Sequence, residues 1–181
     1  SYGVLDKSGT LKTFVNSGAI TAGVPSGSTG KSVAVDLSAN TTGLGFFNTG
    51  SIFGDVYLGG GNTSVVISNS TINGSVLLQN GAAKSGNNTV NLEKAIIADK
   101  LYLGNGTHSV TLNNGSEITQ GLANGTGTVA LAVNQSKVTL IGTQPLNAST
   151  AAFSSGAALK FDLPSIAPTG SIALAFGNNA S

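Results

Sequence analysis

The chain has 181 residues, a net charge of +1 and only 8% charged residues, with 26 glycines and no cysteine. Because nucleic-acid-binding domains carry a strong basic excess, this charge balance argues against a nucleic-acid partner. The lack of cysteine excludes disulfide bonds and thiolate metal sites. Apolar residues recur at a period of two, and no apolar run reaches the roughly 18 residues that a transmembrane helix needs. The composition therefore predicts an all-β domain with many short strands.

The first recurring feature is an Asn- or Ser-rich turn that is followed by Ile or Val. Gly and Asn tolerate the left-handed backbone that a sharp corner requires. Asn side chains stacked from one coil to the next can also form hydrogen-bonded ladders. We therefore expect corners between strands in the segments NSGAI, NTGSI, SNSTI, NNGSEI and NQSKV, which begin at Asn16, Asn48, Ser68, Asn113 and Asn134.

The interval from Asn16 to Asn48 is 32 residues, which is longer than one coil, and the extra residues fall in 23–32, GVPSGSTGKS. We predict that this segment is an insertion loop. Its Gly-Lys-Ser ending is shared with phosphate-binding loops, but that pattern needs a glycine where this chain has Pro25. The segment is therefore interpreted as a surface loop, with Lys31 as a candidate for contact with a partner.

Three similar strands begin at Val56, Val76 and Leu101, which are 20 and 25 residues apart. A period of roughly 19–25 residues is too short for a propeller blade, and the leucine-rich repeat pattern is absent. We predict a single-stranded right-handed parallel β-helix of about eight coils, with Val, Ile and Leu facing inward. Residues 91–101 have the most helical composition, but they fall in register with the strands and are predicted as strand and turn. A second series of aligned inward residues is expected at Val66, Val90, Val110 and Val129.

Two carboxylates form the most distinctive pair in the repeat. Asp55 and Asp99 both precede a Tyr-Leu-Gly segment, and we expect them at equivalent positions about two coils apart. Paired carboxylates on one face of a β-helix are typical of polysaccharide-degrading enzymes, whose acids lie at such separations. The coil between them has Gly74 and Ser75 in the matching place. This interruption favours a surface role over a catalytic one.

The aromatic residues Tyr57 and Tyr102 are also expected to be equivalent, with Leu77 between them in an outward-facing row. Such a row suits an interaction surface, although sheet faces commonly carry tyrosine. His108 is the only histidine and lies where a turn enters a strand, with no acid placed beside it. We expect it to be an exposed turn residue, and not part of a catalytic triad or a zinc site. No catalytic, metal-binding or cofactor-binding residue is predicted.

Several segments together resemble the passenger domains of Gram-negative autotransporters. They are DKSGTLKTFVNSGAITA, KSVAVDLSANTTG and NTGSIFGDVYLGGGNTSVVISNSTINGSV, and the resemblance extends from Gly3 to about Gly142. It is greatest to the stalk of large passengers, some of which carry a subtilisin-like protease nearer the N-terminus. Residues 143–181 resemble the less regular coils that follow. The whole chain, 1–181, is therefore expected to be one β-helical piece of a longer passenger.

The resemblance implies export through the outer membrane by a C-terminal β-barrel, outside this chain, and display at the cell surface. We expect a rigid stalk and an adhesion or virulence surface, without enzymatic activity or a cofactor. The expected partners are a host cell-surface or matrix protein, a glycan, or a second copy of the chain. The candidate contact residues are Asp55, Tyr57, Asp99, Tyr102 and Lys31. The alternatives are a non-catalytic spacer in a subtilisin-like protease autotransporter and a β-helical polysaccharide-degrading enzyme.

Overall fold

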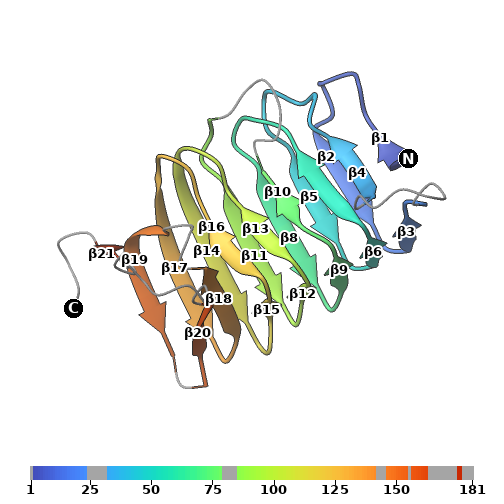
Figure 1. Cartoon of the computed structure of the whole chain (residues 1–181). Helices are drawn as coiled ribbons and strands as arrows, with labels where there is room; N and C mark the ends of the chain where they lie inside the picture. Colours follow the sequence, from blue (N-terminus) through green and yellow to red (C-terminus); the bar gives the residue numbers. More distant parts are fainter. Residues whose placement is uncertain are drawn as a thin grey trace.

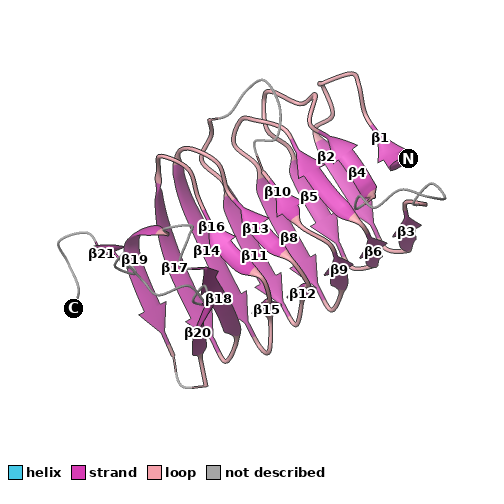
Figure 2. Ribbon diagram, in the orientation of Figure 1, coloured by secondary structure: helices cyan, strands magenta, loops and turns pink. Residues whose placement is uncertain are grey.

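The computed structural model describes residues 2–23, 32–78, 85–141, 146–154, 156–162 and 175–176. The regular structure of these residues is β-strand throughout (Figure 2). They contain no helix, and so none long and apolar enough to cross a membrane. The all-β prediction is confirmed.

The strands form three parallel sheets that run along a rod (Figure 1). Sheet A consists of β1 (Tyr2–Leu5), β4 (Val33–Leu37), β7 (Asp55–Leu58), β10 (Val76–Leu77), β13 (Lys100–Tyr102) and β16 (Gly121–Ala123). Sheet B consists of β2 (Thr13–Asn16), β5 (Gly45–Asn48), β8 (Ser64–Ser68), β11 (Thr89–Glu93), β14 (Thr107–Asn113), β17 (Thr128–Asn134), β19 (Asn147–Phe153) and β21 (Ala175–Phe176). Sheet C consists of β3 (Ala19–Thr21), β6 (Ser51–Phe53), β9 (Thr71–Asn73), β12 (Ile96–Ile97), β15 (Glu117–Ile118), β18 (Lys137–Ile141) and β20 (Ala158–Asp162).

The chain visits sheets A, B and C in turn, and each strand pairs in parallel with its counterpart one turn later. This is the predicted parallel β-helix. Sheet A has six strands, so the described residues make about six full turns and not the expected eight. The estimate was too high because it divided the chain evenly. Tyr2 pairs with Val33, so the first turn spans 31 residues, and β19 and β20 extend only sheets B and C.

Inward-facing side chains from all three sheets form one apolar core along the axis. In sheet A, Val76 pairs with Val56 on one side and with Leu101 on the other, as the repeat predicted. All three side chains are fully buried. Burial of a Val or Leu side chain stabilises the folded state by about 1.5–3 kcal/mol. The aligned apolar positions are therefore a principal source of stability.

In sheet B the predicted alignment is correct for Val90 and Val110, which pair with each other, and wrong for Val66 and Val129. Val66 faces outward and is half-buried, because the inward residue of its strand is the preceding one. Val129 pairs with His108, whereas its expected partner Val110 pairs with Leu131, two residues later. The inward row that contains Val90 and Val110 includes Phe46 and Val65 on one side and Leu131 on the other.

The corners between sheets B and C use left-handed backbone, as expected, but not only at asparagine. Four residues adopt φ values between 49° and 56°, one in each of four turns: Asn69, Lys94, Asn114 and Gln135. Lys94 and Gln135 are exposed, so their long side chains extend into solvent while the backbone makes the corner. The segment 91–101, which contains one of these corners, is strand and turn as predicted.

Polar side chains at the same corner link one turn to the next. Asn16 Nδ2 donates to Asn48 Oδ1 at 2.7 Å, and Asn134 Nδ2 donates to Asn113 Oδ1 at 2.8 Å. Ser116 Oγ accepts the Ala95 N–H, and Ser136 Oγ accepts the Ser116 N–H, both at 3.1 Å. The predicted asparagine ladders are present in part, and a serine ladder accompanies them.

The central turns provide a direct test of the core. Leu92 faces inward and is fully buried, whereas the adjacent Asn91 faces outward. We expect Leu92→Ala to lower the free energy of unfolding by about 2–5 kcal/mol, because it leaves a cavity between stacked turns. Asn91→Ala is the matched control, with an expected change of about 0.5 kcal/mol or less. Urea denaturation followed by circular dichroism measures both, and equal effects would contradict the assigned register.

Candidate functional site

The outer face of sheet A carries two neighbouring rows of side chains that run along the rod. The tyrosine row consists of Tyr57, Leu77 and Tyr102, which pair in register on β7, β10 and β13. The polar row consists of Asp55, Ser75 and Lys100, each two residues before its counterpart in the tyrosine row. Because side chains alternate between the faces of a strand, both rows point away from the core. The predicted equivalence of Tyr57 and Tyr102 is confirmed.

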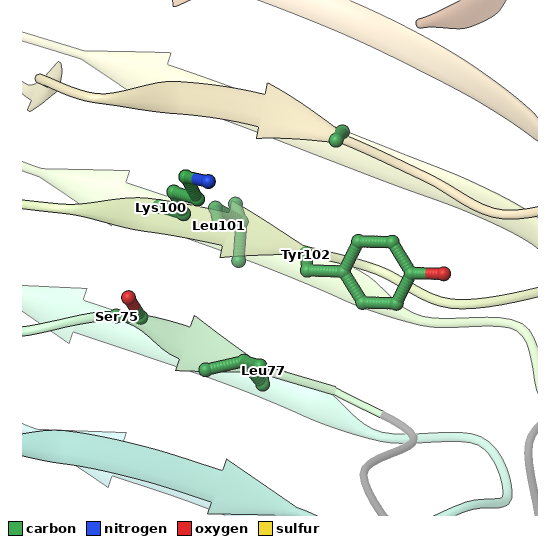
Figure 3. Close-up of a pocket in the computed structure, with 6 residues that line it drawn as sticks. Ser75, Leu77, Lys100, Leu101 and Tyr102 are labelled. Atoms are coloured by element: carbon green, nitrogen blue, oxygen red, sulfur yellow. The ribbon is translucent and has the colours of Figure 1, made fainter. Parts of the chain in front are cut away.

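A shallow depression of about 210 Å³ lies between these rows. In Figure 3 the ring of Tyr102 is seen face-on, beyond the end of its strand, with Leu77 on the neighbouring strand. Tyr102 is 37% exposed, so part of its ring is open to solvent. The lining residues are Ser75, Leu77, Lys100, Leu101, Tyr102 and Ala123.

The acidic residues of this face are tied to the backbone. Asp55 is buried, and its Oδ1 accepts the Ser75 N–H at 2.8 Å. Asp36 Oδ1 accepts the Ser38 N–H at 3.0 Å. Burial raises the pKa of the Tyr57 hydroxyl, and the nearby carboxylates of Asp55 and Asp36 raise it further. Tyr57 therefore keeps its proton and is available as a hydrogen-bond donor.

The predicted equivalence of Asp55 and Asp99 is wrong. The pairing of Val56, Val76 and Leu101 aligns Asp55 with Ser75 and Lys100, so Asp99 stands one residue earlier. The two aspartates precede their tyrosines by two and by three residues, a difference that the shared Tyr-Leu-Gly segment conceals. A shift of one residue changes the direction of a side chain in a sheet. The two carboxylates thus do not form a repeated pair.

Lys31 lies outside the described residues, as do the other residues of 24–31. From the predicted insertion loop 23–32, only Gly23 and Ser32 are described. The loop and the role of Lys31 therefore stay predictions.

The expectation that His108 is an exposed turn residue is also wrong. His108 is 1% exposed and faces the core from the second residue of β14. Thr63, Asn88 and His108 occupy one inward row, in which the Thr63 N–H donates to Asn88 Oδ1 and the Asn88 N–H donates to His108 Nδ1. Thr63 Oγ1 and His108 Nε2 are buried without a hydrogen-bond partner in the protein. This row is a short polar interruption of the apolar core.

The alternation of His108, Val110 and Leu112 was the signal that could have located this histidine in the core. Burial lowers the pKa of His108, and the Gly104 carbonyl opposes the shift only in part. The imidazole is therefore neutral in the folded protein near neutral pH. A buried, neutral imidazole with no carboxylate bonded to it does not have the arrangement of a catalytic triad.

Among the described residues, no three His, Asp or Glu side chains lie close enough together to hold a metal ion. Comparisons with protein-family models, curated proteins and solved structures find no match for this chain. Functional proposals for the chain therefore start from the solenoid and from the two rows on sheet A.

The buried His108 makes stability dependent on pH. Its pKa is lower in the folded chain than in the unfolded chain, so the unfolded chain takes up more protons below about pH 6.5. We expect stability to be constant from about pH 7.5 to 6.5 and then to fall toward pH 5, by at most about 1.4 kcal/mol per pH unit. His108→Val replaces the imidazole with the same residue type as its pairing partner Val129, removes the titrating group and should abolish this slope. Urea titrations at several pH values measure it, and equal slopes in the two proteins would refute the assignment.

Asp55 provides a second prediction. Asp55→Ala leaves the buried N–H of Ser75 without its acceptor, which should cost about 1–3 kcal/mol. Asp55→Asn retains a carbonyl oxygen at this position and should lose less than half as much. Chemical denaturation of both variants measures the difference. Destabilisation of the two variants to the same extent would show that the hydrogen bond is not the source.

Proposed function

We propose that this chain is part of the stalk of a Gram-negative autotransporter passenger, a rigid surface-exposed rod with an adhesive face. The observation that carries the proposal is the continuous parallel register of sheets A, B and C over about six turns. In such a solenoid each turn contacts chiefly its two neighbours, so the architecture extends as an elongated spacer. The described residues of the segments that resemble passenger stalks fall within these turns.

The way in which the rod is stabilised is compatible with export. The chain has no cysteine, and its turns are joined by backbone hydrogen bonds, an apolar core and corner ladders. These interactions form from local coil-on-coil contacts, without disulfide bonds. A passenger that crosses the outer membrane unfolded can build such a structure one turn at a time outside the cell.

The adhesive face is assigned to sheet A, where the tyrosine row and the polar row lie side by side. An exposed aromatic ring is a common anchor in binding surfaces, because it buries a large area at low cost in conformational entropy. A polysaccharide-degrading enzyme receives no support from the aspartates, since Asp55 is held by the Ser75 N–H and Asp99 is out of register with it. We therefore propose a non-catalytic role for these residues. A spacer in a protease autotransporter would use the same rod.

Surface display is the property to test. Antibodies raised against the purified chain should label intact cells of the source organism, and external protease should remove the label. A periplasmic protein, labelled only after permeabilisation, is the control for cell integrity. Labelling of this chain only in permeabilised cells would overturn the proposal.

A further inference from the structure

We propose that the two rows on sheet A bind a neutral, β-linked polysaccharide chain that lies along the rod axis. This inference rests on the proposed adhesive function and specifies its ligand. It follows from the chemistry of the two rows, the small size of the depression and the spacing of the tyrosines.

The tyrosine row provides stacking surfaces. The C–H groups on one face of a pyranose ring carry partial positive charge, and they pack against the negatively polarised face of an aromatic ring. Tyr102 presents a partly exposed ring, seen face-on in Figure 3. Tyr57 lies in the same row two strands away, at about 10 Å, with the apolar side chain of Leu77 between them. In an extended β-linked chain alternate sugar rings have the same orientation, so a chain along the axis can contact both tyrosines.

The polar row runs about 7 Å to the side of the tyrosine row, since the paired residues are two apart on each strand. Sugar hydroxyls lie at the edges of the ring and both donate and accept hydrogen bonds. Ser75 and Lys100 line the depression, where the Ser75 hydroxyl can donate and accept hydrogen bonds and Lys100 offers ammonium donors. Asp55, at the end of this row, is buried and already accepts the Ser75 N–H. This row holds one acid and one base, and Asp36, which pairs with Tyr57, adds a second carboxylate to the face. The face therefore disfavours a polyanionic glycan.

The dimensions favour a narrow ligand. The depression of about 210 Å³ is smaller than the roughly 300–1,000 Å³ of pockets for drug-sized molecules. Its size suits a single sugar ring, partly covered. The two rows span about 10 Å by 7 Å, whereas a stable protein partner covers about 800 Å² on each side. A polysaccharide that contacts successive points along the rod requires no broad surface.

Isothermal titration calorimetry with the whole chain tests the proposal, with cellohexaose and chitohexaose as neutral probes. We expect at least one of them to bind, and Tyr102→Ala to weaken that binding by at least about tenfold. Tyr102→Phe keeps the ring and should bind within a few fold of the parent chain. Phe53→Ala removes an exposed aromatic side chain from sheet C and should leave binding unchanged. Circular dichroism should show that all three variants remain folded, because both side chains point outward.

Three outcomes would overturn the inference. The first is that neither probe binds. The second is that the parent chain and Tyr102→Ala bind equally well. The third is that heparin binds in preference to both probes. If intact cells are nevertheless labelled by the antibody, only the glycan inference fails and surface display stands. If labelling requires permeabilised cells, the proposed function fails whatever the calorimetry shows.

Discussion

The in-register pairing of parallel strands from one turn to the next is the constraint on which the rest of the structure depends. It places equivalent residues on top of one another about 4.8 Å apart, so each position along a strand becomes a row along the rod. The corners must then repeat as well, which explains why left-handed residues recur after sheet B and why Ser116 and Ser136 stack there. A solenoid therefore accommodates the substitution of one residue within a row more readily than a change of register that moves a whole strand relative to its neighbours.

The rows that face inward explain the stability of a chain without disulfide bonds. Val, Leu and Ile lie on their counterparts in neighbouring turns, and all three sheets contribute to one core that runs along the axis. The polar row of Thr63, Asn88 and His108 is the exception. Asn88 and His108 each accept a hydrogen bond from the backbone of the preceding turn, but the Thr63 hydroxyl and His108 Nε2 stay unpaired. Burial disfavours the charged imidazolium and so lowers the pKa of His108 in the folded chain, which is why this site links stability to pH.

The rows that face outward are free of packing requirements and can serve binding. On sheet A, an aromatic and apolar row lies beside a polar row, and the ladder holds both at fixed spacing. The two rows run side by side along the rod, so one row provides stacking contacts and the other provides hydrogen-bonding contacts. The rod thereby offers a linear surface, which is the basis of the adhesive role proposed above.

The sequence by itself determined the fold class, because alternation of apolar residues and a recurring interval of 20–25 residues are compatible with few architectures. It also determined the alignment of Val56, Val76 and Leu101, and with it the tyrosine row. It could not determine register within a turn, because loops of different length separate the strands. One residue of offset misassigned Asp99 and Val66, and two residues of offset misplaced Val129, which pairs with the buried His108. Only the tertiary structure decided these positions, since hydrogen bonds between turns, and not local patterns, set which side chains share a row and which face they occupy.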